Sequence, residues 1–304
     1  MTITALAGGV GGARCLVGLQ RVLGENLTAI VNTGDDAEFY GVHVSPDVDI
    51  VSYWLAGIAD INRGWGLKDD TFHLVEGMRK LGEDAWFSLG DRDLATCVFR
   101  TGRLAGGATL TAVTDEIRRR LGIATRIIPM SDDPVRTRVV TSDGRNLEFQ
   151  EYFVKERSEP SVEQILFEGI SEAKPAPGVI EALTGAERII LCPSNPLLSI
   201  EPILALPGVR DALREHTDVV AVSPIVGGNA IKGPLALMLA DRGADVSPAG
   251  VASFYAGLCS TFVVDEVDAE LVDAVKEFIP NVLTAPTIIP DPDASETLAR
   301  VLLA

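Results

Sequence analysis

The sequence predicts an α/β fold: a doubly wound, mainly parallel Rossmann-like sheet with a helical cap and a small antiparallel hairpin insertion. Short β-branched runs alternate with segments of helical periodicity, a pattern typical of parallel strands joined by crossover helices. The first apolar run passes through a glycine cluster directly into a helical segment, and one hairpin signal interrupts the alternation. We expect a single domain over residues 1–304, with the cap and insertion at about residues 47–170.

The individual elements follow from these patterns in chain order. After the apolar run at residues 2–7 and a helix at 15–23, buried strands are predicted at residues 28–31, 126–128, 188–191, 219–222 and 261–264. Helices are predicted at residues 49–55, 71–81, 94–101, 110–121, 209–215, 235–242 and 269–278. The runs at 138–141 and 146–149 flank the turn sequence SDGR, which predicts the hairpin.

The composition is that of an ordinary folded enzyme-sized chain. Its 304 residues are 47% hydrophobic and 23% charged, enough to bury a large core without disulfides. No Cys-x-x-Cys pair occurs, so the cysteines are expected to be core thiols in a reducing compartment: Cys15, Cys97, Cys192 and Cys259. No apolar segment approaches the roughly 20 residues that span a bilayer. No basic region precedes the first apolar run, so we expect a cytoplasmic protein without a membrane partner.

The net charge of −17 excludes nucleic acid as a general partner, because phosphate backbones are held by clustered Lys and Arg. The same net negative charge repels an anionic substrate, so local positive charge must offset it at the binding site. Such a substrate needs neutralisation by backbone amides, by a divalent metal, or by placed cations such as Arg14, Arg92 or Lys232.

The glycine cluster predicts a phosphate-binding turn, formed by Gly8, Gly9, Gly11 and Gly12. Glycines permit tight turning and close ligand approach, and the first amides of the following helix face an anion. Arg14 adds a charge-assisted contact at the same place. The third small residue of the dinucleotide fingerprint is missing, and the absence of Gly-Lys-Ser/Thr excludes a Walker-type loop. The alternative is a glycine-rich turn that merely packs a helix onto the sheet.

The segments that follow the predicted strands are polar and rich in turn residues: 32–36, 129–134, 193–196 and 223–229. Doubly wound sheets bind ligands at the carboxyl ends of their strands, so we expect these segments to converge on one site. Ser194, Asn195 and Ser199 are expected to bind a base or a phosphate; alternatively they only begin a turn and a helix.

An acidic group follows the second predicted strand and comprises Asp35, Asp36, Asp47 and Asp49. Its oxygens suit a hard cation that bridges phosphate oxygens, although each aspartate is equally compatible with capping a helix or solvating a turn.

The motif LGDRD at residues 89–93 places Asp91 or Asp93 at a helix start, with Arg92 beside it. Arg92 then faces a phosphate or a substrate ring edge, unless the helix is simply capped and the arginine solvated. The tryptophans at 54, 65 and 86 favour the core of the cap over a ring-stacking site, although a flat heterocycle suits them.

These motifs together resemble the 2-phospho-L-lactate transferase family, and the resemblance extends from residue 1 to about residue 268. Eight motifs occur in the family's order: GGVGGAR at 8–14, NTGDD at 32–36, SPDVD at 45–49, LGDRD at 89–93, IPMSDDP at 128–134, FQEY at 149–152, PSNP at 193–196 and VSPIVGG at 222–228. So many ordered motifs make the resemblance highly specific.

The resemblance implies a step in the biosynthesis of the deazaflavin coenzyme F-420. A 2-phospholactyl group, or an enolpyruvyl phosphate group in bacterial relatives, passes from its guanosine diphosphate ester to the ribityl hydroxyl of the deazaflavin Fo, and GMP is released. The shared motifs do not choose between the two donors. Mg²⁺ is the expected metal, and a homodimer is the expected assembly.

The resemblance also implies roles for individual residues. The four glycines, Arg14 and Asn32 belong to the phosphate-facing part, and the guanosine side is assigned to Ser194, Asn195, Ser199, Gly227 and Gly228. The metal ligands are expected to be Asp35, Asp36 and Asp49. The expected catalytic residues are Asp49 as general base, with Asp36 and Arg92. The deazaflavin contacts are expected at Asp49, Ser88, Asp91 and Arg92, where Ser88 replaces a basic residue of many relatives.

Two other classes of function are weighed against the transferase. A nicotinamide-dependent oxidoreductase would use Asp35 or Asp36 on the ribose, but the fingerprint lacks its third small residue. A non-catalytic nucleotide-binding regulator, of a gluconeogenesis-factor family that resembles this chain at the glycine loop, would not need the SPDVD and LGDRD motifs.

Overall fold

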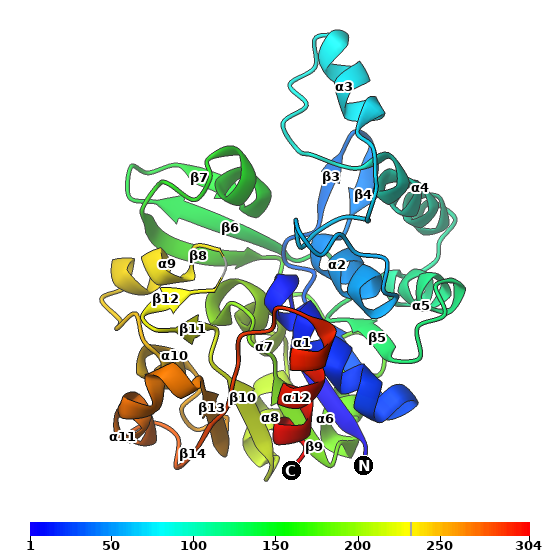
Figure 1. The fold of residues 1–304 in the computed structure, drawn as a ribbon. Helices are drawn as coiled ribbons and strands as arrows, with labels where there is room; N and C mark the ends of the chain where they lie inside the picture. Colours follow the sequence, from blue (N-terminus) through cyan, green and yellow to red (C-terminus); the bar gives the residue numbers. More distant parts are fainter. Residues whose placement is uncertain (232) are drawn as a thin grey trace.

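The computed structural model describes residues 1–231 and 233–304, so Lys232 lies outside the described residues. Within them, a seven-stranded sheet forms the centre of the molecule in the order β14-β13-β10-β9-β1-β2-β5 (Figure 1). Each neighbouring pair of these strands is parallel, which confirms the predicted fold class. The strands are β1 (Ile3–Ala7), β2 (Leu27–Val31), β5 (Arg126–Pro129), β9 (Arg188–Leu191), β10 (Val219–Val222), β13 (Thr261–Val264) and β14 (Asn281–Thr284).

Helices cover both faces of the sheet, so its central strands are apolar on both sides. Leu6 and Ile30 point into one core, which α6, α8 and α10 close. Ala5 and Ala29 point into the other core, which α1 and α12 close (Figure 1). The bounds are α1 (Gly9–Leu23), α6 (Val179–Gly185), α7 (Glu201–Leu204), α8 (Val209–Glu215), α10 (Pro248–Phe254), α11 (Val272–Lys276) and α12 (Pro292–Leu302).

The strand order reverses between β1 and β9. From β1 the chain continues outward through β2 and β5, and it later returns to β9 and continues through β10, β13 and β14 on the other side. At such a switch point the loops after the two adjacent strands leave toward opposite faces and open a crevice at the strands' carboxyl ends. The segments 8–14 and 193–196 meet at this crevice.

The cap projects from the sheet edge, with α3 at its far end (Figure 1). It contains its own small core around Val44, Val75 and Leu89, which explains how it keeps its shape away from the central sheet. The elements are β3 (Ala37–Phe39), β4 (Val42–Val44), α2 (Pro46–Leu55), α3 (His73–Lys80), α4 (Asp91–Ala105) and α5 (Leu110–Arg120).

The antiparallel insertion is a three-stranded sheet in the order β7-β6-β8. Its hairpin of β6 (Arg136–Thr141) and β7 (Asn146–Glu148) is the predicted one, whereas β8 (Val162–Glu168) was not predicted. A short π-helical turn, η2 (Glu151–Lys155), follows the hairpin. Further small elements are η1 (Gly24–Asn26), η3 (Pro196–Ile200), β11 (Ile225–Val226), β12 (Asn229–Ala230), α9 (Leu235–Asp241) and η4 (Glu266–Leu271).

Several elements differ from their predictions for identifiable reasons. The first helix begins at Gly9 rather than Cys15, because the glycines themselves form its first turn. The predicted helix at 269–278 is divided between the end of η4 and α11, and Asp268 within η4 has a non-helical backbone conformation. The unpredicted strand β14 lies at the sheet edge and is mostly exposed, so it lacks the apolar run of a buried strand. No helix in the described part of the chain has the length and apolar character needed to cross a bilayer.

The contact between α1 and α12 yields a first testable prediction. A Cβ at Gly18 would lie 2.0 Å from the carbonyl oxygen of Ser295, and the amide of Gly18 donates to the Ser295 hydroxyl at 2.7 Å. We expect Gly18→Ala to lower the free energy of unfolding by about 1–3 kcal/mol, measured by denaturant titration. In the control Gly102→Ala, the new Cβ has open space, so stability should be kept or raised by about 0.5–1 kcal/mol. Equal stability of the two variants would contradict this account of the interface.

Candidate functional site

A cavity of about 400 Å³ lies at the carboxyl ends of the central strands. Loops that follow β1, β2, β9 and β10 supply part of its lining, as the polar strand ends predicted. The segment at 129–134 does not reach it, because Asp132 instead binds the amide and hydroxyl of Thr111. The cap and the insertion supply the remaining walls.

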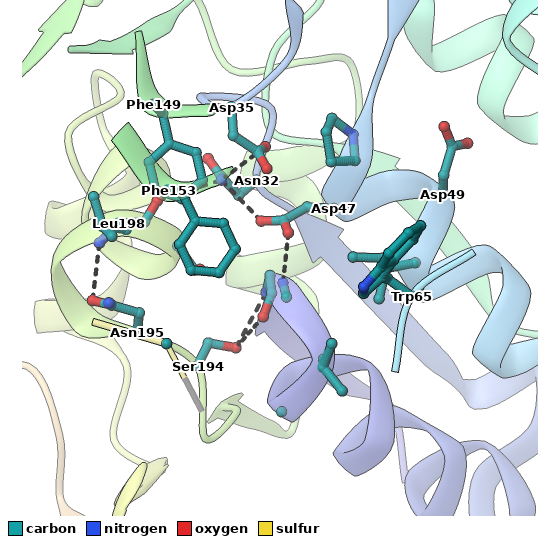
Figure 2. A pocket seen from close by; sticks show the side chains of 18 of the residues that line it. Asn32, Asp35, Asp47, Asp49, Trp65, Phe149, Phe153, Ser194, Asn195 and Leu198 are labelled. Carbon is teal, nitrogen blue, oxygen red and sulfur yellow. Dashed lines mark hydrogen bonds between the residues drawn. The ribbon is translucent and has the colours of Figure 1, made fainter. Parts of the chain in front are cut away.

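The start of α1 holds a carboxylate of the protein itself. The amide of Gly9 donates to Asp47 Oδ1 at 2.7 Å, and Gly9 has a positive φ of 62°. The amide of Gly8 donates to Ser194 Oγ, whose hydroxyl in turn donates to the Gly8 carbonyl. Free amides and the helix dipole make this end of a helix favourable for an anion, and Asp47 makes use of that property (Figure 2).

Asp47 and Asp35 are held together by one amide group. Asn32 Nδ2 donates to Asp47 Oδ2 at 3.0 Å and to Asp35 Oδ1 at 3.4 Å (Figure 2). Gln150 Nε2 donates to Asp35 Oδ2 at 3.3 Å. Burial raises the pKa of Asp35 well above its usual value, and the charges of Asp47 and Asp36 add to this effect. Burial also raises the pKa of Asp47 to about 6, against the hydrogen bonds from Asn32 and Gly9. When both are ionised, these two buried carboxylates, which share one donor, create a strongly negative electrostatic potential.

The three aspartates predicted to share a metal point in different directions. Asp36 accepts hydrogen bonds from Ser45 Oγ at 2.7 Å and contacts His43 Nε2 at 2.9 Å, outside the lining of the cavity. Asp49 lines the cavity on the side away from Asp35 (Figure 2). The structure therefore pairs Asp35 with Asp47 and leaves the other two apart from them.

Asp49 belongs to a second buried cluster. Its Oδ1 accepts from the completely buried guanidinium of Arg100, while its Oδ2 has no hydrogen-bond partner among the described residues. Burial raises the pKa of Asp49, and Arg100 opposes that shift. The nearby Asp93 accepts from the Tyr53 hydroxyl at 2.7 Å, and burial with the charge of Asp49 raises the pKa of Asp93 to about 7.

The glycines permit close packing as well as anion binding. A Cβ at Gly8 would lie 2.3 Å from Asp47 Oδ2, and one at Gly11 would lie 2.3 Å from the Pro193 carbonyl oxygen. Gly12 is outside the lining, facing Ser194. The packing interpretation of the cluster therefore holds at Gly8, Gly11 and Gly12, and the phosphate site stays a prediction.

The predicted cations make other contacts. Arg14 lines the cavity, but its guanidinium donates to the carbonyls of Ile289 and Ile61 and lies over the ring of Trp54. Arg92 is exposed, lies outside the lining and donates to the Lys68 carbonyl. Lys232 lies outside the described residues.

The LGDRD motif presents different side chains from those predicted. Ser88 and Asp93 line the cavity, whereas Asp91 accepts from the amides of His73 and Leu74 and so caps the start of α3. The helix α4 begins at Asp91, and its first turn directs Asp93 inward.

Only some of the residues predicted for the guanosine side line the cavity. Ser194, Asn195 and Ser199 line the cavity, and Asn195 Oδ1 caps the π-helical turn η3 through two backbone amides. Gly227 and Gly228 lie outside the lining, and the Gly227 amide donates to the buried carboxylate of Asp268.

Aromatic rings form opposite ends of the cavity. Trp65 and Phe87 belong to the cap, and Phe149 and Phe153 belong to the insertion. Trp54 belongs to the core of the cap, as predicted: it is buried, and its indole N–H donates to the Gly64 carbonyl. Trp65 instead lines the cavity. Sequence alone placed Asp47 only in the general acidic group, and it left Tyr53, Gln150, Phe149 and Phe153 without a site assignment. The FQEY motif at residues 149–152 contains two of these residues, Phe149 and Gln150, and was the sequence signal for them.

The cap and the insertion also contact each other beside the cavity. Lys155 Nζ lies 3.1 Å from Asp84 Oδ2 and 5.6 Å from the ring centre of Trp86. Lys155 directly follows the lining residues Phe153 and Val154, so this contact joins two of the cavity walls.

The fold and the site define an α/β protein of the doubly wound class, with a cavity at the carboxyl ends of its parallel strands. The model of the family described as 2-phospho-L-lactate transferase CofD matches residues 3–287, and the chain belongs to this family. It is thus a transferase of coenzyme F-420 biosynthesis, of the phosphoenolpyruvate or phospholactate type. Family membership favours this class over the regulator and the oxidoreductase.

Relatives of both names match over nearly their whole length. A phosphoenolpyruvate transferase of Streptomyces griseus is 43% identical, with 100% of this chain and 98% of the relative covered. A 2-phospho-L-lactate transferase of Methanosarcina mazei is 39% identical, with 98% of each covered. The solved structure of protein BH3568 from Bacillus halodurans shares the fold with a TM-score of 0.67 at 14% identity, covering 100% of this chain and 99% of that one.

The raised pKa of Asp93 predicts a pH-dependent stability. The stability that its neutral form contributes is fully present below the unfolded pKa and is lost as the pH rises through about 7. In Asp93→Asn the amide oxygen still accepts from Tyr53, but nothing titrates. We measure the free energy of unfolding of both proteins by urea titration at about pH 5.5 and about pH 8. The decrease between these two pH values should be about 2 kcal/mol larger for the wild type than for the variant. Parallel pH curves for the two proteins would show that Asp93 titrates normally.

Proposed function

We propose that this chain transfers a 2-phospholactyl or enolpyruvyl phosphate group from its guanosine diphosphate ester to the ribityl hydroxyl of Fo. The observation that carries the proposal is one cavity with the start of α1 and the buried carboxylates of Asp35 and Asp47 at its centre, and with aromatic rings at both ends. Phosphates suit the centre and flat heterocycles suit the ends. The names of the relatives supply the three-carbon group.

In the proposed reaction, the ribityl oxygen attacks the phosphorus atom that carries the three-carbon group. A new P–O bond forms to Fo, the bond from this phosphorus to the bridging oxygen breaks, and that oxygen leaves as part of GMP. The hydroxyl proton is lost. Such transfer depends on in-line positioning and charge neutralisation more than on an elaborate catalytic group.

We propose Asp35 and Asp47 as the residues that hold Mg²⁺, in place of the set Asp35, Asp36 and Asp49. Both carboxylates are buried, both face Asn32, and the pKa of each is raised, which is the environment that a divalent cation relieves. When bound, the ion would neutralise charge on the phosphates. The diphosphate would lie at the start of α1, where the helix dipole favours negative charge.

Asp49 is the proposed acceptor of the hydroxyl proton. Asp49 lines the cavity, and its buried Oδ2 has no hydrogen-bond partner among the described residues, while Arg100 holds Oδ1. Asp36 and Arg92 lie outside the lining, so their catalytic roles stay predictions. The homodimer also stays a prediction, based on the family resemblance.

The proposed reaction is tested by turnover with Fo, Mg²⁺ and each guanosine diphosphate ester in turn. We expect GMP release in equal amount to a deazaflavin product whose mass contains the phosphate and the three-carbon group. Removal of Mg²⁺ by a chelator should lower turnover by more than about 100-fold. The preferred ester identifies the donor, and GMP release without a modified deazaflavin would refute transfer to Fo.

Asp49→Asn tests the proposed base. We expect turnover to fall by about 10²–10⁴-fold with GDP binding kept, because the amide cannot take the proton. Asp273→Asn, at an exposed position of α11, is the control and should keep full turnover. Full turnover of Asp49→Asn would remove Asp49 from this role.

A further inference from the structure

The two aromatic ends of the cavity differ in their construction. At one end Phe149 and Phe153 stack on each other, with ring centres 5.5 Å apart and planes at 10°. Phe153 is 37% exposed although it lines the cavity, so part of its ring is available to a ligand. Trp65 lies on the other side of Asp47 in Figure 2, together with Asp49.

The end formed by Phe149 and Phe153 lies beside the loops that follow β9 and β10. Asn195 and Leu198 come after β9, Pro224 comes after β10, and all three line the cavity. Leu198 is tied to the central polar group, because its carbonyl accepts from Asn32 Nδ2 at 3.4 Å. This end is therefore on the β9 side of the switch point between β1 and β9, whereas the Trp65 end belongs to the cap.

Nucleotides bind to doubly wound sheets at the switch point, with their phosphates at the glycine-rich helix start. The strand β1 has two neighbours, β2 and β9, so a nucleoside attached to a diphosphate at the start of α1 can lie along the loop of either one. The loop after β2 carries the buried carboxylate of Asp35, which leaves the loop after β9 and the ring of Phe153 as the side for a base.

One short segment connects this surface to the phosphate region. Gln150 lies between Phe149 and Phe153 in the chain and donates to Asp35 Oδ2. The π-helical turn η2 carries Phe153, and such turns are frequent at functional sites. Because Gln150 anchors the segment to Asp35, the stacked rings keep a set position relative to the central carboxylates.

We infer that Phe149 and Phe153 form the stacking surface for the guanine base of the donor, with Phe153 in direct contact. The inference rests on the proposed function, and it leaves the Trp65 end to the ring of the acceptor. Stacking uses the π-face of the base and requires no hydrogen bond, which fits an end of the cavity built from rings.

The test uses GDP alone and Fo alone as separate probes of the full-length protein, titrated by calorimetry in Mg²⁺. We expect Phe153→Leu to weaken GDP binding about tenfold and to leave Fo binding within about twofold. Trp65→Leu should show the reverse pattern. Phe99→Leu is the matched control, because Phe99 lies outside the lining on α4 under Arg103 and Arg120, and it should change neither affinity.

Several outcomes would overturn the inference: unchanged GDP affinity in Phe153→Leu, a selective loss of Fo binding in that variant, or no GDP binding by the wild type. Phe149→Leu provides a second variant if thermal melting shows that Phe153→Leu is unfolded. Failure of the proposed function is separate, since it would appear as wild-type protein that binds GDP but does not modify Fo.

Discussion

The hydrogen bond from the Gly9 amide to Asp47 is the interaction on which the arrangement of the site depends. It joins the first turn of α1 to the cap helix α2, and Asn32 at the end of β2 holds the other oxygen of the same carboxylate. Three segments thus meet at one side chain. The close approach is possible only because Gly8 has no Cβ, which would lie 2.3 Å from Asp47 Oδ2. The glycine cluster is therefore as much a requirement of packing between the cap and the sheet as of ligand binding.

The same contact concentrates negative charge inside the molecule. Asp35 and Asp47 are buried beside each other, and a buried arginine, Arg100, is paired with Asp49 rather than with them. Desolvation and like charge both favour the protonated forms, which explains the raised pKa values of Asp35 and Asp47. The chain has a net charge of −17, and the carboxylates at this centre attract a cation. They would repel a phosphate unless a cation were bound beside it. The proposed Mg²⁺ follows from that charge balance.

Each of the three parts of the chain, the sheet, the cap and the insertion, contributes residues to the lining of the cavity. The sheet supplies the helix start and the loops at the switch point, the cap supplies Asp49, Trp65 and Ser88, and the insertion supplies Phe153. In the proposed reaction, the ring systems of the two substrates would lie at opposite ends of this cavity with the phosphates between them. The structure of BH3568 shares this fold at 14% identity, and a likeness at that level concerns the fold alone.

The sequence by itself determined the parallel sheet, the glycine turn into α1 and the hairpin at β6 and β7, because these follow from local patterns of apolar and turn residues. It also carried the motifs that placed the chain in its family. Only the tertiary structure decided that Asp47 rather than Asp36 faces Asp35, and that Asp93 rather than Asp91 or Arg92 points into the cavity. Neighbouring residues of one motif point in different directions, and the choice among them depends on partners far away in the chain. Gln150 and Asp35, for example, are 115 residues apart, and no local pattern records that they touch.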